Sequence, residues 1–268
     1  MKKFFKKIVD FFKSLFEVID ENIEEIEPEI EEESPEIVDE IEIEEVPEVK
    51  PETPVVQEPE IVPEPEPKEE VYVMLTNKER QTYFKELGLY TISIDNVRGP
   101  KQKLAEKIFN TIFLNKLEDT YTEATDKMLR EIYASYKASK YMTDSDWKYF
   151  KNFKKSEFYC TCKKKYCDGY NGLENKLPMR LVMVLQYVRN YYGKAVKLTS
   201  TIRCKTRNSQ VGGITKSKHM EFRAADNNVK DVKANDVVKL VYKGTNKVPF
   251  VKYAYAITDN ESHIDVEI

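Results

Sequence analysis

The sequence predicts an α+β protein in which helices come first and a small antiparallel sheet with further helices follows. Apolar residues recur at helical spacing within residues 77–140 and again from 177 to 192. Segments with alternating or β-branched character predict strands at 195–200, 251–257 and 263–268. Helices combined with a small sheet of this kind define the α+β class.

Residues 1–19 predict an amphipathic helix. Its charged residues interrupt the apolar ones, so we expect neither a conventional signal peptide nor a transmembrane helix. We expect residues 1–18 to lie on a membrane surface or to dock on a protein surface. The apolar residues of the predicted helix face are Phe5, Ile8, Phe12, Leu15 and Phe16.

Residues 20–72 predict a disordered acidic linker. Residues 20–70 contain about 23 acidic residues, only two lysines, and nine of the 12 prolines. A segment of this composition cannot bury enough apolar surface to offset its conformational entropy.

The acidic linker also offsets a positive charge on the rest of the chain. The formal net charge is −4, but residues 71–268 carry roughly +14.

This basic charge favours polyanionic partners such as an acidic cell-wall polymer or a membrane surface, unless the lysines serve only solubility. A nucleic-acid partner would be supported by charge alone. No aromatic platform or recognition-helix motif accompanies the lysines. We therefore expect no specific nucleic-acid binding.

Residues 77–140 predict a small helical module. The turn signal Arg98-Gly99-Pro100 precedes a helical repeat, and a second repeat follows Thr120. The stretch from Leu87 to Phe109 resembles a three-helix peptidoglycan-binding module found beside cell-wall hydrolases. Asn96 replaces a turn glycine of that module and Gln102 replaces its threonine. The resemblance implies a peptidoglycan-binding role, and the alternative is a helical spacer.

Residues 145–268 predict the C-terminal domain that contains the sheet. A helix is expected from Leu177 to Tyr192, where Gly193 would end it, and a second helix from Val237 to Tyr242 after Asn235-Asp236. This domain also contains all four cysteines. Their spacing is not a standard zinc motif, so zinc binding, disulfides and free thiols all stay open. They are Cys160, Cys162, Cys167 and Cys204.

Both histidines of the chain lie in its last 50 residues. His219 precedes Asp226 by seven positions, and His263 follows in Ser262-His263-Ile264-Asp265-Val266. Two imidazoles and a carboxylate suit zinc, which takes three protein ligands in catalytic sites and leaves a fourth position open. Hydrogen-bonded structural histidines are the alternative.

The order of motifs around these residues resembles the zinc D-alanyl-D-alanine carboxypeptidase and L-alanyl-D-glutamate endopeptidase family, which includes many bacteriophage endolysins. In that family Ser-Gly-Tyr-Arg, Asn-x-x-Val-Gly-Gly, Ser-x-His-x-x-Gly-x-Ala-x-Asp and Val-His-Ile-Asp-Val follow one another. The corresponding stretches here are Ser200–Arg203, Asn208–Gly213, Ser217–Asp226 and His263–Val266. The resemblance covers about 100 residues and implies zinc-dependent hydrolysis of peptidoglycan.

The resemblance also implies roles for individual residues. Its zinc ligands would be His219, Asp226 and His263. Arg203 would pair with a carboxylate of the peptide stem, because a guanidinium binds carboxylates in a bidentate geometry. Ser217 would hold the ligand loop or contact the substrate.

Two positions depart from the family. The acidic general base often found three residues before the last histidine is replaced by Asn260. Glu261 is the first candidate to take its role, because period-two alternation places it on the same strand face as His263. Asp259 is the second. Asp265 shares that face but is expected to orient His263 or to pair with a basic residue.

The second departure is Phe222, which stands where the family has glycine, so this turn must relax or the ring must line the pocket. The leading hypothesis is a phage or prophage lysin, a zinc peptidase that acts on the bacterial cell wall. The alternative is a weak or inactive protein of the same fold that binds peptidoglycan or forms part of a virion.

Overall fold

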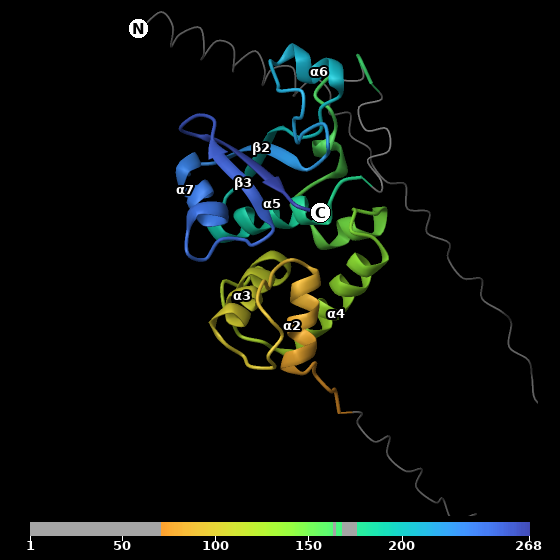
Figure 1. Ribbon diagram of the computed structural model, residues 1–268, viewed down its shortest axis with the longest axis vertical. Helices are drawn as coiled ribbons and strands as arrows, with labels where there is room; N and C mark the ends of the chain where they lie inside the picture. The colour runs from red at the N-terminus through yellow and green to blue at the C-terminus, as the bar shows by residue number, and fades with distance from the viewer. Residues whose placement is uncertain (1–70, 163–164, 168–175) are drawn as a thin grey trace, which may run out of the picture. The chain divides into compact units, whose positions relative to one another are not determined.

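The computed structural model describes residues 71–162, 165–167 and 176–268, which Figure 1 colours from orange to blue. All of these residues belong to one compact unit, Pro67–Ile268. The predicted helix over 1–19 and nearly all of the predicted linker over 20–72 lie outside the described residues. Among the described helices, none is long and apolar enough to cross a membrane.

Three helices form the first part of the described chain, as the periodicity of residues 77–140 predicts. The hydroxyls of Thr76 and Thr122 cap the first and third of them by accepting backbone N–H groups three residues later. The second begins at Pro100, where the missing N–H removes no helical hydrogen bond. The helices are α2 (Asn77–Glu86), α3 (Pro100–Leu114) and α4 (Glu123–Ala138).

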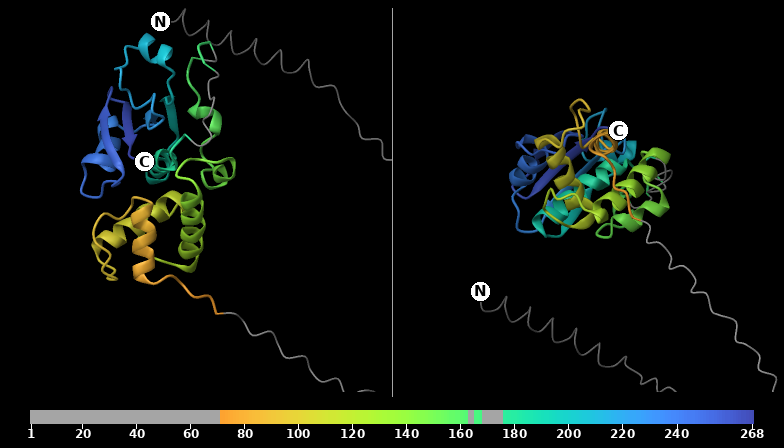
Figure 2. Two further views of the ribbon diagram at one scale, coloured as in Figure 1. Left: turned by 45° about the vertical axis from the view of Figure 1, so that its right-hand side comes forward. Right: turned by 90° about the horizontal axis from the view of Figure 1, so that it is seen from below.

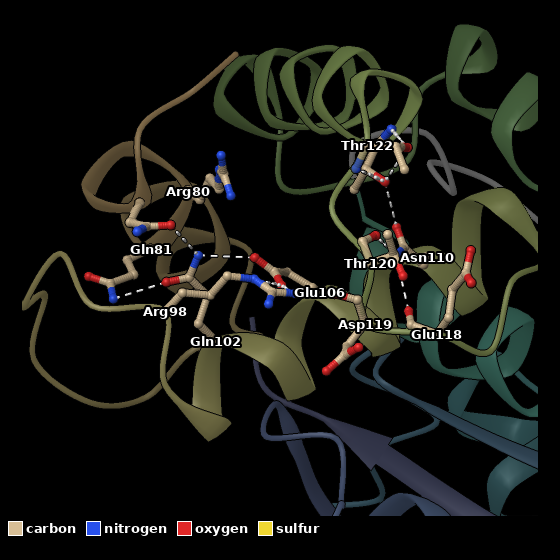
Figure 3. A network of polar contacts seen from close by, with 12 residues as sticks. Arg80, Gln81, Arg98, Gln102, Glu106, Asn110, Glu118, Asp119, Thr120 and Thr122 are labelled. Carbon is tan, nitrogen blue, oxygen red and sulfur yellow. Dashed lines mark hydrogen bonds and ion pairs between the residues drawn. The ribbon is translucent and has the colours of Figure 1, made fainter.

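A buried polar network joins α2 to α3 (Figure 3). The Gln81 amide donates to Gln102 Oε1 at 3.1 Å, and Gln102 donates to Glu106 Oε1 at 3.0 Å. Arg98 Nε donates to the other oxygen of Glu106 at 2.8 Å. Asn96 adopts a left-handed φ of 63°. The two residues that depart from the peptidoglycan-binding module therefore have structural places here, Gln102 in the network and Asn96 in the turn.

The chain then passes through two short 3₁₀ helices into a long buried helix. The sequence predicts its start at Leu177, but the helix begins two residues later, because its N-cap residue Pro178 has extended backbone with a ψ of 133°. Gly193 ends the helix with a left-handed φ of 60°, as predicted. The three elements are η1 (Asp144–Tyr149), η2 (Lys155–Phe158) and α5 (Met179–Tyr192).

Helix α5 lies between the helical part and the sheet. Its Arg180 donates to the backbone carbonyl of Leu87 at 3.0 Å, and its Asn190 donates to that of Thr111 at 2.7 Å. It also packs against strands of the sheet. One hydrophobic core consequently includes residues from both parts, among them Phe84, Phe109, Leu185 and Phe250.

Four antiparallel strands form one sheet in the order β1-β2-β4-β3, which confirms the predicted α+β class. Figure 2 shows the described chain from two further sides. The strands are β1 (Val196–Ser200), β2 (Ala224–Val229), β3 (Val251–Ala256) and β4 (Glu261–Val266). Three short helical segments lie between them in the chain. These are α6 (Lys205–Gln210), α7 (Ala234–Val238) and the π-helical turn η3 (Lys239–Lys243).

The structure corrects two predicted boundaries in this region. The last strand, predicted from His263 to Ile268, starts at Glu261, because the backbone N–H groups of Ile257 and Thr258 close the hairpin on the Glu261 carbonyl. The helix predicted from Val237 begins at Ala234, with Lys233 rather than Asn235 at its N-cap. Strand β2 was not predicted as a strand, although it occupies a central position in the sheet.

Candidate metal centre

Sheet register brings two of the three predicted ligands together. Asp226 of β2 is paired directly with His263 of β4, and Tyr255 of β3 is paired with His263 on the other side. Residues that face each other on antiparallel strands project from the same face of the sheet. The third residue, His219, comes from the turn that precedes β2. All three predicted ligands are buried.

The donor atoms of these three side chains converge on one point. His263 Nδ1 lies 2.7 Å from Asp226 Oδ1, and His219 Nε2 lies 3.2 Å from the same oxygen. The two imidazole nitrogens are 3.3 Å apart. Ligands at the usual zinc–nitrogen distance in a tetrahedron are separated by about 3.3 Å. Two imidazoles and one carboxylate at this spacing fit zinc and leave a fourth position for water or substrate.

A backbone hydrogen bond on the side away from Asp226 fixes the orientation of the His219 ring. Its Nδ1 donates to the backbone carbonyl of Thr201 at 2.5 Å, and a carbonyl can only accept a hydrogen bond. In the neutral ring the Nε2 atom therefore carries a lone pair directed at Asp226 and His263. An outer hydrogen bond of this kind is typical of histidines that bind metals.

Arg203 contacts the ligand set itself. Its Nη2 donates to Asp226 Oδ2 at 2.5 Å, and its Nε donates to Ser200 Oγ at 2.7 Å. Burial raises the pKa of the Asp226 carboxyl, but the close approach of His219 and His263 outweighs this and holds that pKa below its ordinary value. Asp226 is therefore a carboxylate, the form that binds a metal.

The three ligand residues face an open cavity of about 640 Å³. Arg203 and Ser217 line this cavity, as their predicted roles require. Gly212 and Gly213, from the predicted Val-Gly-Gly turn, line it too. Its remaining lining residues are Val211, Ile214, Lys216, Lys218, Tyr253, Tyr255, Ile257 and Asp265.

Neither of the two acids preferred as general base lines the cavity. Glu261 lies on the predicted strand face, but two residues along a strand separate it from His263 by about 7 Å. Its carboxylate instead accepts a hydrogen bond from the hydroxyl of Thr199 in β1. Asp259 is exposed in the hairpin turn, where its carbonyl accepts the N–H of Ala234. The structure therefore places both acids outside the cavity lining, and a general-base role for either of them stays a prediction.

Asp265 is the carboxylate that shares the cavity with the ligands. Its Oδ2 lies 3.9 Å from His263 Nε2, the ring nitrogen that does not face Asp226. Burial raises the pKa of Asp265. The separation is longer than a hydrogen bond, so the orientation of His263 by Asp265 stays a prediction.

Sequence reasoning missed the tyrosines of the cavity wall. The Tyr255 ring stacks on His263 with centroids 4.9 Å apart, and Tyr253 lies beside Tyr255. Burial raises the pKa of Tyr255. The signal was present in the alternation of β3, because Tyr253, Tyr255 and Ile257 share a face. It could not be used without the register that pairs Tyr255 with His263.

Phe222 adopts a left-handed backbone conformation, which glycine takes more readily than other residues. Its φ is 64°, a left-handed value that is costly for a bulky residue. The ring does not line the cavity and packs against the hydrophobic core instead. The turn between His219 and Asp226 therefore has a left-handed residue at the position where the resembling family has glycine.

A family model agrees with this site. Residues 151–265 match the family described as Peptidase M15. No curated protein matches the chain significantly. The family match includes all three candidate ligands and Arg203. The region 151–265 is therefore similar to the M15 peptidases, and this similarity indicates a metallopeptidase.

Proposed function

We propose that this protein is a zinc-dependent peptidase that cleaves a peptide bond in the stem peptides of bacterial peptidoglycan. One observation carries the proposal. His219 Nε2, Asp226 Oδ1 and His263 Nδ1 converge on an open cavity, within a region that matches the Peptidase M15 family. A buried ligand set with an open position is the arrangement of a catalytic rather than a structural zinc site.

The protein's residues would prepare this site for hydrolysis. A bound zinc ion would polarise the scissile carbonyl and lower the pKa of a water molecule. The Thr201 carbonyl fixes the tautomer and ring orientation of His219. Asp265 would orient His263 from its far nitrogen, and Arg203 holds the second oxygen of Asp226.

The cavity wall suits a peptide that carries carboxylates. Arg203, Lys216 and Lys218 contribute positive charge, and Tyr253 and Tyr255 offer aromatic surface. Stem peptides end in a carboxylate, so this lining supports a carboxypeptidase or endopeptidase of DD or LD type. Arg203 already binds Asp226 through one nitrogen. We therefore assign the substrate carboxylate to Arg203 together with a lysine.

The remaining parts of the chain would deliver this activity to the cell wall. We assign residues 77–140 a peptidoglycan-binding role and residues 1–18 a contact with a membrane surface. The basic charge of residues 71–268 favours an acidic wall polymer over a neutral partner. Together these features support a phage-encoded lysin.

A second function, a weak or inactive peptidoglycan-binding or virion protein, is favoured by one observation. Neither Glu261 nor Asp259 lines the cavity. Under this alternative the metal would be bound but turnover would be slow, because among the lining residues only Asp265 is a carboxylate that is not itself a metal ligand.

Digestion of purified peptidoglycan separates the two functions. The full-length protein with zinc is incubated with cell-wall sacculi, and the soluble products are identified by mass spectrometry. We expect new muropeptides with a cleaved stem and none with His219→Ala. The matched control Lys230→Ala alters an exposed residue outside the cavity and should retain full activity.

Binding of the sacculi without any new product, at full zinc occupancy, would select the inactive wall-binding function. Cleavage by His219→Ala at the wild-type rate would overturn the metallopeptidase assignment.

A further inference from the structure

The four cysteines form a second cluster of potential metal ligands. Cys160, Cys162 and Cys167 come from the segment that follows η2, and Cys204 immediately precedes α6. The four sulfur atoms lie within 4.8 Å of one another. Cys160 and Cys162 are buried, and the other two are partly buried. All the cysteines of the chain thus meet at one place, although Cys204 is 37 residues from Cys167 in sequence.

The spacing of the sulfurs fits a single tetrahedral ion. At a zinc–sulfur distance of about 2.3 Å, four ligands of a tetrahedron lie about 3.8 Å apart. The Cys162 and Cys167 sulfurs are 3.3 Å apart, and all pairs stay within the 4.8 Å limit. A disulfide would bring two sulfurs to about 2.05 Å. The four sulfurs are therefore spaced like the ligands of one metal ion, and the Cys162–Cys167 separation is longer than a disulfide bond.

Backbone groups are directed at two of the sulfurs. The Cys204 N–H donates to Cys160 Sγ at 3.3 Å, and the Arg207 N–H donates to Cys204 Sγ at 3.4 Å. Hydrogen bonds from N–H groups to sulfur stabilise metal-bound thiolates. The loop between Cys162 and Cys167 also contains three consecutive lysines in its sequence, which would offset the negative charge of a four-thiolate site.

We propose that Cys160, Cys162, Cys167 and Cys204 bind a second, structural zinc ion. Four sulfur ligands close the coordination sphere, so this ion would take no part in hydrolysis. It would fasten the 160–167 loop to the chain at Cys204, next to Arg203, which contacts Asp226. The zinc would therefore support the cavity wall from outside the candidate metal centre. The proposal is independent of the peptidase function.

Metal analysis of variants of the full chain tests this site without relying on activity. Wild type should contain about two zinc ions per chain and His219→Ala about one. In the His219→Ala background, Cys162→Ser should lose the remaining ion. The neighbouring Thr161→Ala, whose side chain contacts Arg207 and not the sulfurs, should retain it.

Cobalt replacement gives a spectroscopic readout on a folded protein. His219→Ala loaded with cobalt should show the intense thiolate-to-cobalt absorption of a four-sulfur tetrahedral site. Titration of wild type with a mercurial reagent should release one zinc as the four thiols react, so the test does not depend on Cys162→Ser folding.

Three results would overturn the proposal. They are His219→Ala without bound zinc, a cobalt spectrum without thiolate absorption, and unfolded protein with no reactive thiols before reduction. The last result would show that disulfides join the cysteines.

Discussion

Two buried aspartates, Asp126 and Asp226, differ in the groups that surround their negative charge. Burial raises the pKa of Asp126, but its hydrogen bonds outweigh burial and lower that pKa to about 2. Tyr72, Tyr121 and Arg130 donate to this carboxylate at distances of 2.6 to 2.7 Å. Every one of these partners is a donor, so the protein satisfies Asp126 by itself.

The two oxygens of Asp226 have different kinds of partner, unlike those of Asp126. Arg203 donates to its Oδ2, but its Oδ1 faces His219 Nε2 at 3.2 Å. Because the Nδ1–H of His219 is used by the Thr201 carbonyl, the neutral ring directs a lone pair at the carboxylate. His263 Nδ1 lies 2.7 Å from the same oxygen and can donate to it, but a lone pair on His219 Nε2 that faces the carboxylate is stabilised only when a proton or a metal ion lies between the two. The comparison indicates that a buried charge satisfied by donors is structural, whereas converging acceptors indicate a metal site.

Substitution of the two aspartates should give the largest contrast. Asp226→Asn should remove zinc from the candidate metal centre and lower peptidase activity by more than about 10³-fold, beyond the loss typical of a single electrostatic contact. Asp126→Asn should leave both zinc content and activity per folded molecule unchanged. Equal activity losses in the two variants would break the distinction between a structural and a metal-binding carboxylate.

Asp265 and Glu261 provide the next contrast. Asp265→Asn should weaken zinc affinity or activity by about 10- to 100-fold, because it removes the carboxylate that lies nearest to His263 Nε2. Glu261→Gln should change activity by less than about threefold, since its carboxylate contacts Thr199 outside the cavity. Competition with a chelator measures the affinity. If Glu261→Gln lost peptidase activity but kept normal zinc affinity, Glu261 would be the general base.

The stability effect of Asp126 should be smaller but measurable. The lowering of its pKa from 3.8 to about 2 corresponds to about 2.5 kcal/mol of folding stability at neutral pH. Asp126→Asn should therefore lower the free energy of unfolding by about 2–3 kcal/mol in urea titrations. An unchanged midpoint would show that the donors do not stabilise this charge.

The difference in unfolding free energy between wild type and Asp126→Asn should depend on pH. Because the folded pKa of Asp126 is lowered, its contribution is fully present above the unfolded pKa near 3.8 and is lost as pH falls through about 2. The stability difference between wild type and Asp126→Asn should accordingly shrink between pH 4 and 2. A difference that stays constant over this range would contradict a contribution from charge.

The elements with strong periodicity could be predicted from the sequence, and weakly patterned ones could not. Helix α5 and strand β3 carry clear apolar repeats, and both lie within two residues of their predicted bounds. Strand β2 reads Ala-Ala-Asp-Asn-Asn-Val, and asparagine and aspartate are depleted in strands. It forms a strand because it is paired on both sides, which is a tertiary effect.

Some residues of the candidate site could likewise be predicted from the sequence and others could not. His219, Asp226 and His263 could be selected from their chemistry and motif order, and the structure brings all three together. The position of the Glu261 carboxylate could not, because alternation gives the face of a strand but not the contact with Thr199 of β1 that holds this side chain. Tyr255 required the β3–β4 register, which no local pattern in the sequence specifies.

Anomalous diffraction at the zinc edge, on crystals grown with zinc, tests the central claim most directly. We expect a peak about 2.0–2.2 Å from His219 Nε2, Asp226 Oδ1 and His263 Nδ1. The four cysteines provide an internal reference, because their own peak would lie about 2.3 Å from the sulfurs. Zinc-saturated crystals with an ordered His219 and His263 but no peak between them would contradict that claim.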